Sequence, residues 1–76
     1  MIKMFGIDEE VYNHIKDSYP EMIEKSYDRC SQLVFKRECS LDFSAGIATI
    51  SMENYGGAMT ESFNVMAIDF WRIEIE

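Results

Sequence analysis

The C-terminal segment "ESFNVMAIDFWRIEIE" (61–76) constrains the fold more strongly than any other part of the chain. It is rich in β-branched and aromatic residues and has neither proline nor glycine, which favours an extended strand. Because successive side chains of a strand point to opposite faces, the segment would present two distinct surfaces. One surface is almost entirely apolar and is expected to face the core. Its members are Phe63, Val65, Ala67, Trp71, Ile73 and Ile75, with Asp69 as the exception.

The opposite surface of this predicted strand should be wet, but its centre is apolar. Met66, Ile68 and Phe70 alternate there, between polar residues at both ends. Three interpretations are open: a helix over 60–70 would bury these side chains, a bulge near Asp69 would redirect the chain, or the patch is exposed on a sheet. We adopt the exposed patch as the working hypothesis, because such patches on small proteins commonly mark protein interfaces.

In the rest of the chain, the pattern of residues predicts two helices followed by strands. In residues 8–19, apolar residues recur at every fourth position and form one stripe of a helix. Pro20 suits the first turn of a second helix, predicted over 19–32, although one helix kinked at this proline is an alternative. From Leu33 onward, "LVFKREC" and "LDFSAGIATISM" have the composition of strands.

These segments predict a single α+β domain over 1–76, in which two N-terminal helices pack on one face of a three- or four-stranded antiparallel sheet. Two helices of this size can cover only one face, so the apolar patch would have no cover within the chain. Gly56-Gly57 is expected to form a hairpin turn rather than a phosphate-binding loop. The reason is that no Lys or Arg lies between Arg37 and Arg72, while Glu53 and Glu61 flank the glycines.

The acidic balance of the chain limits its partners. The formal net charge is −7, and Lys36-Arg37 is the only basic pair. Nucleic-acid binding needs clustered cations that displace counterions from phosphates, so we expect no direct contact with DNA or RNA. No segment has the roughly 18 apolar residues of a membrane span, and the N-terminus lacks a signal-peptide pattern. We therefore expect a cytoplasmic protein without membrane contact.

No recognisable catalytic set can be assembled from the sequence. Glu10, His14 and Asp17 would share one face of the first helix and could bind a metal weakly or act as a base, but an ordinary solvated helix face is the preferred explanation. Cys30 and Cys39 have no CxxC or Cys/His spacing and are expected to be free thiols. We therefore expect no enzymatic activity, no cofactor and no bound metal.

The sequence thus predicts a small protein-binding module, expected to be a homodimer, that inhibits or sequesters a protein target. The predicted interface consists of Met66, Ile68 and Phe70, with Arg72, Glu74 and Glu61 as its polar rim. The size and acidity are similar to those of phage-encoded inhibitors, and an acidic face could instead mimic nucleic acid. That face would consist of Asp42, Glu53, Glu61, Asp69, Glu74 and Glu76.

A small-molecule- or nucleotide-binding protein is the alternative function. Its pocket would lie between protomers, or between the second helix and the sheet. The expected walls are Tyr27, Phe43, Tyr55 and Trp71. Weak catalysis around His14 is a third hypothesis.

Overall fold

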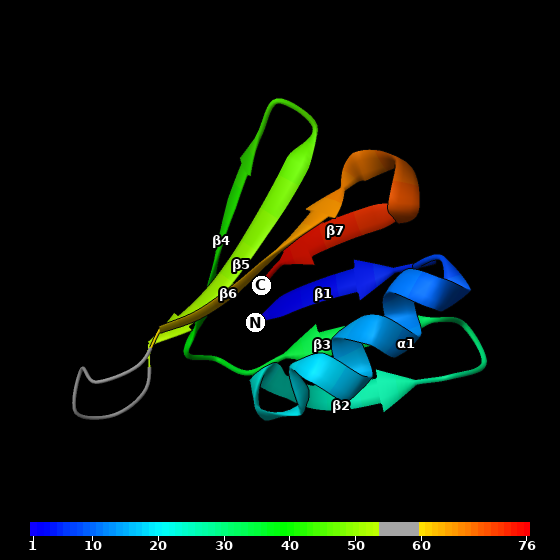
Figure 1. The fold of residues 1–76 in the computed structure, drawn as a ribbon, viewed down its shortest axis with the longest axis horizontal. Helices are drawn as coiled ribbons and strands as arrows, with labels where there is room; N and C mark the ends of the chain where they lie inside the picture. The colour runs from blue at the N-terminus through cyan, green and yellow to red at the C-terminus, as the bar shows by residue number, and fades with distance from the viewer. Residues whose placement is uncertain (54–59) are drawn as a thin grey trace.

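The computed structural model describes residues 1–53 and 60–76. Most of this part of the chain forms strands, with one α-helix and two short 3-10 turns (Figure 1). In chain order the elements are β1 (Ile2–Phe5), α1 (Glu9–Ser18), the 3-10 turn η1 (Pro20–Met22), β2 (Ile23–Tyr27), β3 (Gln32–Phe35), β4 (Cys39–Ser44), β5 (Ile47–Glu53), β6 (Thr60–Met66), the 3-10 turn η2 (Ala67–Asp69) and β7 (Arg72–Ile75).

The strands form two antiparallel sheets. The four-stranded sheet has the order β2-β3-β1-β7, and the three-stranded sheet has the order β4-β5-β6. β1 pairs with both β3 and β7, so the first and last strands of the chain lie side by side (Figure 1). The four-stranded sheet is therefore completed by contacts between residues that are far apart in the sequence.

The predicted fold class is wrong, because only one α-helix forms among the described residues and the strands make two sheets. Residues 23–27 belong to β2, not to a second helix, and pair with β3 from Tyr27↔Gln32 to Ile23↔Phe35. Ile23 and Tyr27 have helical spacing, but a bulge between Ile23 and Lys25 places their side chains on opposite faces of the strand, so they form no common stripe. The strand is favoured here because β3 supplies hydrogen-bond partners along its length.

The helix predicted over 8–19 is confirmed as α1, and η1 follows it in place of a second helix. Tyr12 and Ile15 point into the core and are 3% and 1% exposed. The Tyr12 hydroxyl donates a hydrogen bond to the Asp28 carboxylate (2.6 Å), and the Lys16 ammonium donates to the same oxygen (2.9 Å). These bonds join α1 to the turn that follows β2.

The core is shared by α1 and both sheets. Figure 1 shows α1 lying across β2 and β3, with the three-stranded sheet standing on the side of β1 and β7. Phe63 of β6 joins these layers, because its ring stacks on Tyr19 at 4.8 Å and lies 5.7 Å from the ring of Phe35. The largest fully buried side chains are Phe35, Met4, Ile15, Met22, Leu33 and Ile50. Burial of each such side chain stabilises the fold by roughly 1.5–3 kcal/mol.

The segment "LDFSAGIATISM" contains two strands, because the chain reverses at Ala45-Gly46 between β4 and β5. Both residues have positive φ, +52° for Ala45 and +75° for Gly46. A two-residue turn with positive φ at both positions has the twist that connects antiparallel strands without splaying them. The turn expected at Gly56-Gly57 lies outside the described residues.

Candidate functional site

The segment predicted to be one strand, 61–76, passes instead from one sheet to the other. β6 ends at Met66, η2 follows, and β7 joins the four-stranded sheet. Three backbone hydrogen bonds hold this crossing: Ala67 N–H to Gly46 O (2.8 Å), Asp8 N–H to Asp69 O (2.8 Å) and Trp71 N–H to Phe5 O (2.9 Å). Of the three interpretations, redirection of the chain near Asp69 comes nearest to this path, and the helix is limited to a single 3-10 turn.

The crossing changes which side chains of this segment are buried. Phe63 and Val65 lie in the core as expected, but Trp71 is 76% exposed although the alternating pattern placed it on the core side. The pattern fails there because η2 breaks the alternation between the two strands. Met66 and Ile68 are 54% and 81% exposed. Phe70, the third predicted patch residue, is half-buried and packs against the core.

Two segments far apart in the sequence bring exposed apolar side chains together at one end of the molecule. We call this surface the apolar corner and define it as Ile47, Met66 and Ile68. Ile47 and Met66 are direct cross-strand partners on β5 and β6, and Ile68 follows in η2. Phe43 is also exposed but lies outside the corner: it pairs with the buried Ala48 on the inward face of this sheet, where its ring meets the half-buried Phe70 edge to face, with ring centroids 6.4 Å apart. Ile47 was not part of the predicted interface, because only the pairing of β5 with β6 brings it beside Met66.

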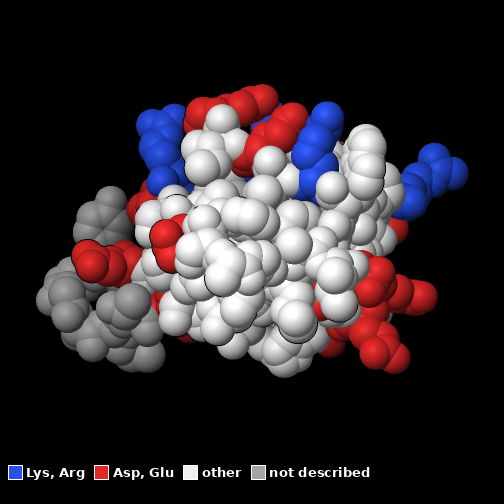
Figure 2. All heavy atoms as spheres, turned by 90° about the horizontal axis from the view of Figure 1, so that it is seen from above, with Lys and Arg blue, Asp and Glu red and all other residues white. Residues whose placement is uncertain are grey.

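Polar side chains border the apolar corner on the outer face of the three-stranded sheet. The neighbouring rows on this face are polar and bond to one another: Thr49 Oγ1 donates to Asn64 Oδ1 (2.9 Å), and the hydroxyls of Ser40 and Ser51 are 3.1 Å apart. Figure 2 views the molecule from the side of the β4–β5 turn and η2. The centre of that view is a broad area without Lys, Arg, Asp or Glu, and charged side chains gather around it.

The predicted polar rim is not assembled around the corner. The Arg72 guanidinium lies over the Phe5 ring at 4.5 Å and 3.5 Å from the Glu74 carboxylate, on the face of the four-stranded sheet that points away from the core. Glu61 pairs with Met52 near the opposite end of β6, on the inward face. Its Oε2 atom is enclosed and has no hydrogen-bond partner in the described part of the chain.

The acidic residues considered as a nucleic-acid mimic do not share one face. Asp42 lies opposite Thr49 on the outer face of the three-stranded sheet. Glu74 lies opposite Lys3 on the outer face of the four-stranded sheet, and Glu61 points inward. In residues 1–53 and 60–76, these three carboxylates therefore do not belong to one continuous acidic surface.

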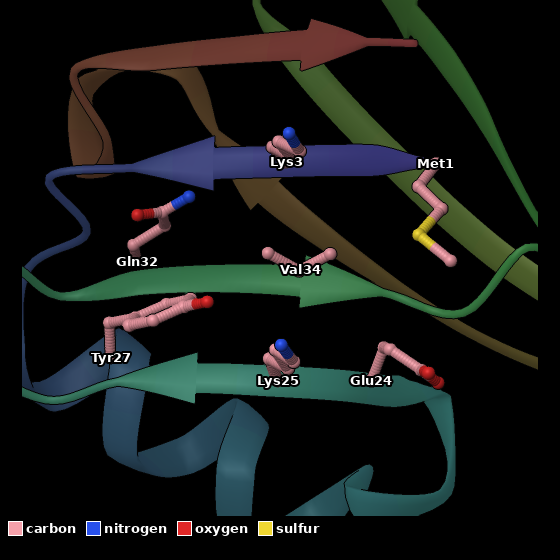
Figure 3. A pocket seen from close by; sticks show the side chains of 7 residues that line it. All are labelled: Met1, Lys3, Glu24, Lys25, Tyr27, Gln32 and Val34. Atoms are coloured by element: carbon pink, nitrogen blue, oxygen red, sulfur yellow. The ribbon is translucent and has the colours of Figure 1, made fainter.

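A hollow lies on the outer face of the four-stranded sheet (Figure 3). It has a volume of ≈ 380 Å³ and is lined by Met1, Lys3, Glu24, Lys25, Tyr27, Gln32 and Val34. Tyr27 was among the expected pocket walls, whereas Phe43 and Trp71 lie elsewhere and Tyr55 is outside the described residues. The pocket expected beside a second helix does not exist in that form, because β2 occupies that segment.

The candidate catalytic groups remain apart. His14 is exposed on α1, with Nδ1 3.4 Å from the Ser18 hydroxyl. Within residues 1–53 and 60–76, no three His, Cys, Asp or Glu side chains come together as metal ligands. Cys30 and Cys39 are free thiols, and burial raises the pKa of Cys39, whose Sγ lies 3.6 Å from the Met22 carbonyl oxygen. A thiol with a raised pKa is a weak nucleophile near neutral pH.

In the described part of the chain, no helix combines the length and the apolar character that crossing a membrane requires. Comparison with known proteins gives no family model, no curated protein and no solved structure that matches this chain.

Proposed function

We propose that this protein is a non-enzymatic binding module that docks a protein target through the apolar corner and thereby inhibits or sequesters it. The observation that supports this function is the exposure of Ile68, at 81%, next to the exposed cross-strand pair Ile47 and Met66. The face seen from the side of the β4–β5 turn and η2 has no charged side chain at its centre (Figure 2). Exposed apolar clusters of this kind are uncommon on monomeric proteins and usually mark interaction sites.

The energetics of the corner suit a compact anchor. Burying an exposed Ile or Met side chain at an interface contributes roughly 1.5–3 kcal/mol. A few such residues at the centre of an interface commonly supply most of its binding free energy. Ile68 protrudes most, so it is the residue that a hydrophobic pocket on the target would enclose.

The charge of the chain indicates the chemistry of the target. With 14 acidic and 7 basic residues, the protein would approach a basic surface faster than an acidic one. We therefore propose a target whose hydrophobic pocket is bordered by Lys and Arg. A homodimer would use the same corner, but two copies of charge −7 repel each other, so a basic target is the better match.

The matched variants Ile68→Asp and Ile75→Asp test this function. Both replace a strongly exposed isoleucine, but Ile75, 68% exposed, lies at the opposite end of β7 from the corner. Each variant and the wild type are immobilised and exposed to a lysate of the source organism, and circular dichroism verifies folding. We expect wild type and Ile75→Asp to retain the same basic protein and Ile68→Asp to lose it, with affinity reduced about 10- to 100-fold.

Hydrogen exchange on the complex with the purified target provides the second measurement. Protection of Ile47 and of residues 66–68 supports docking at the corner. Equal retention by all three proteins, or protection elsewhere only, refutes the proposal. Light scattering on the free protein separates the homodimer from a target complex: a dimer that Ile68→Asp dissociates would assign the corner to self-association.

A further inference from the structure

We propose that the groove on the outer face of the four-stranded sheet binds a small organic anion, with an apolar or aromatic body and one carboxylate or phosphate group. This site is separate from the apolar corner. Its volume of ≈ 380 Å³ falls within the range of small-molecule sites, about 300–1,000 Å³. Neither α1 nor the three-stranded sheet covers this face, because both pack on the opposite side, which carries the core residues.

A bulge in β2 creates the groove. The register between β2 and β3 shifts by one residue between Ile23↔Phe35 and Lys25↔Val34, so that Glu24 is the extra residue. Without this shift, strand alternation would turn Lys25 inward, along with Tyr27 two residues later. With the shift, both side chains point outward. Bulges recur beside functional sites because they redirect side chains in this way.

Two lysines flank one apolar position at the centre of the groove. Lys3 and Lys25 are the cross-strand neighbours of Val34, one on each side. Adjacent strands lie about 4.8 Å apart, so the Cα atoms of the two lysines are about 10 Å apart, within reach of a single anionic group. Figure 3 shows both lysine side chains rising from the sheet on either side of Val34.

The two cations differ in whether a carboxylate already neutralises them. The Lys3 ammonium lies 2.9 Å from the Glu76 carboxylate, which raises the pKa of Lys3. Lys25 has no carboxylate within 4.0 Å in residues 1–53 and 60–76. An incoming anion would therefore be stabilised mainly by the ammonium group of Lys25, with Lys3 on the other side of the anion. Glu24 lies at the rim, with its carboxylate directed away from the centre in Figure 3.

The other end of the groove suits the body of the ligand. Val34, 7% exposed, forms the floor, and the Tyr27 ring, 43% exposed, lies along the sheet with its hydroxyl toward Val34 (Figure 3). Gln32 pairs with Tyr27 across β2 and β3 and supplies an amide at the edge. An aromatic ring could stack on Tyr27 while its acidic group reaches Lys25.

Isotope-edited NMR with naphthalene carboxylate at pH 7 tests the site, with naphthalene methanol as the neutral probe of the same shape. For a ligand of this size in an open groove, a dissociation constant of about 1 mM is expected. We expect saturable shifts of the amides of Lys3, Lys25, Tyr27, Gln32 and Val34. The neutral probe should bind about tenfold more weakly, because it cannot form charge-assisted hydrogen bonds.

Lys25→Gln should weaken the binding of naphthalene carboxylate about tenfold and leave the binding of the neutral probe unchanged. Arg37→Gln is the matched control, because it removes one positive charge from an exposed turn that does not line the groove. No saturable shift at these amides, equal binding of both probes, or equal weakening by the two substitutions would overturn the proposal. Tighter binding of an extended acidic peptide than of naphthalene carboxylate would assign the groove to a peptide instead.

Discussion

Replacing Gly6 with alanine should destabilise the protein more than the same change at Gly46, although both glycines have positive φ, +61° and +75°. A Cβ at Gly46 would meet nothing within 4 Å, so its cost is conformational alone, roughly 1–2 kcal/mol. A Cβ at Gly6 would lie 2.9 Å from the Trp71 Cβ. This contact cannot be relieved by a rotamer change, because the atom is attached directly to the backbone that donates to Phe5 O.

The steric contribution at Gly6 is that of overpacking, about 1–3 kcal/mol, which brings the total for Gly6→Ala to about 2–5 kcal/mol. A chain of 76 residues has a total stability of roughly 4–11 kcal/mol, so the variant should remain partly or fully folded. Urea unfolding, followed by circular dichroism, resolves the difference. With a slope of about 1 kcal/mol per molar urea, each kcal/mol of destabilisation lowers the unfolding midpoint by about 1 M.

Asparagine at the same two positions isolates the clash. Asn tolerates positive φ, so Gly46→Asn should be nearly neutral, whereas Gly6→Asn should retain the steric cost. Emission of Trp71, the only tryptophan, should also change in both Gly6 variants. Equal destabilisation at the two positions, with unchanged Trp71 emission, would show that the crossing after η2 does not pack against Gly6.

Two further predictions concern stability. Ala45→Asn should raise the free energy of unfolding by about 0.5–1 kcal/mol, because Asn suits positive φ beside Gly46 in the two-residue turn; a lower urea midpoint would contradict the turn geometry. Tyr12 and Lys16 donate hydrogen bonds that lower the pKa of Asp28 below its usual 3.8. The resulting stabilisation is present above that value and is lost as the pH falls through the folded-state pKa. Tyr12→Phe should therefore reduce the loss of stability between about pH 6 and pH 2.5, and an unchanged loss would refute the linkage.

Local patterns predicted the elements that local interactions determine. The stripe in residues 8–19 predicted α1, because its apolar spacing matches a helix that buries one face. The β-branched composition after Leu33 predicted strands there, and Phe63 and Val65 are buried as strand alternation requires. Exposure of Met66 and Ile68 was also predicted, but the two do not share one long strand: Met66 lies on the outer face of the three-stranded sheet, and Ile68 lies in the turn η2 between the two sheets.

The features that the sequence could not predict depend on partners far along the chain. β7 completes a sheet with β1, and no pattern within 61–76 indicates that its last residues belong to a different sheet from Phe63. The corner has the same origin, because Ile47 reaches Met66 only through the pairing of β5 with β6. Pairing of this kind is a property of the whole fold.

The bulge at Glu24 illustrates the limit most clearly. In "IEKSY", strict alternation would place Ile23, Lys25 and Tyr27 on one face. Such a strand would bury a lysine against Phe35 and Leu33, at the cost of removing an unpaired charge from water. One extra residue keeps Ile23 facing inward and turns Lys25 outward, so the bulge resolves a conflict between two incompatible side chains. The groove on the outer face is therefore a consequence of core packing, and any ligand specificity of Lys25 and Tyr27 depends on that same one-residue shift.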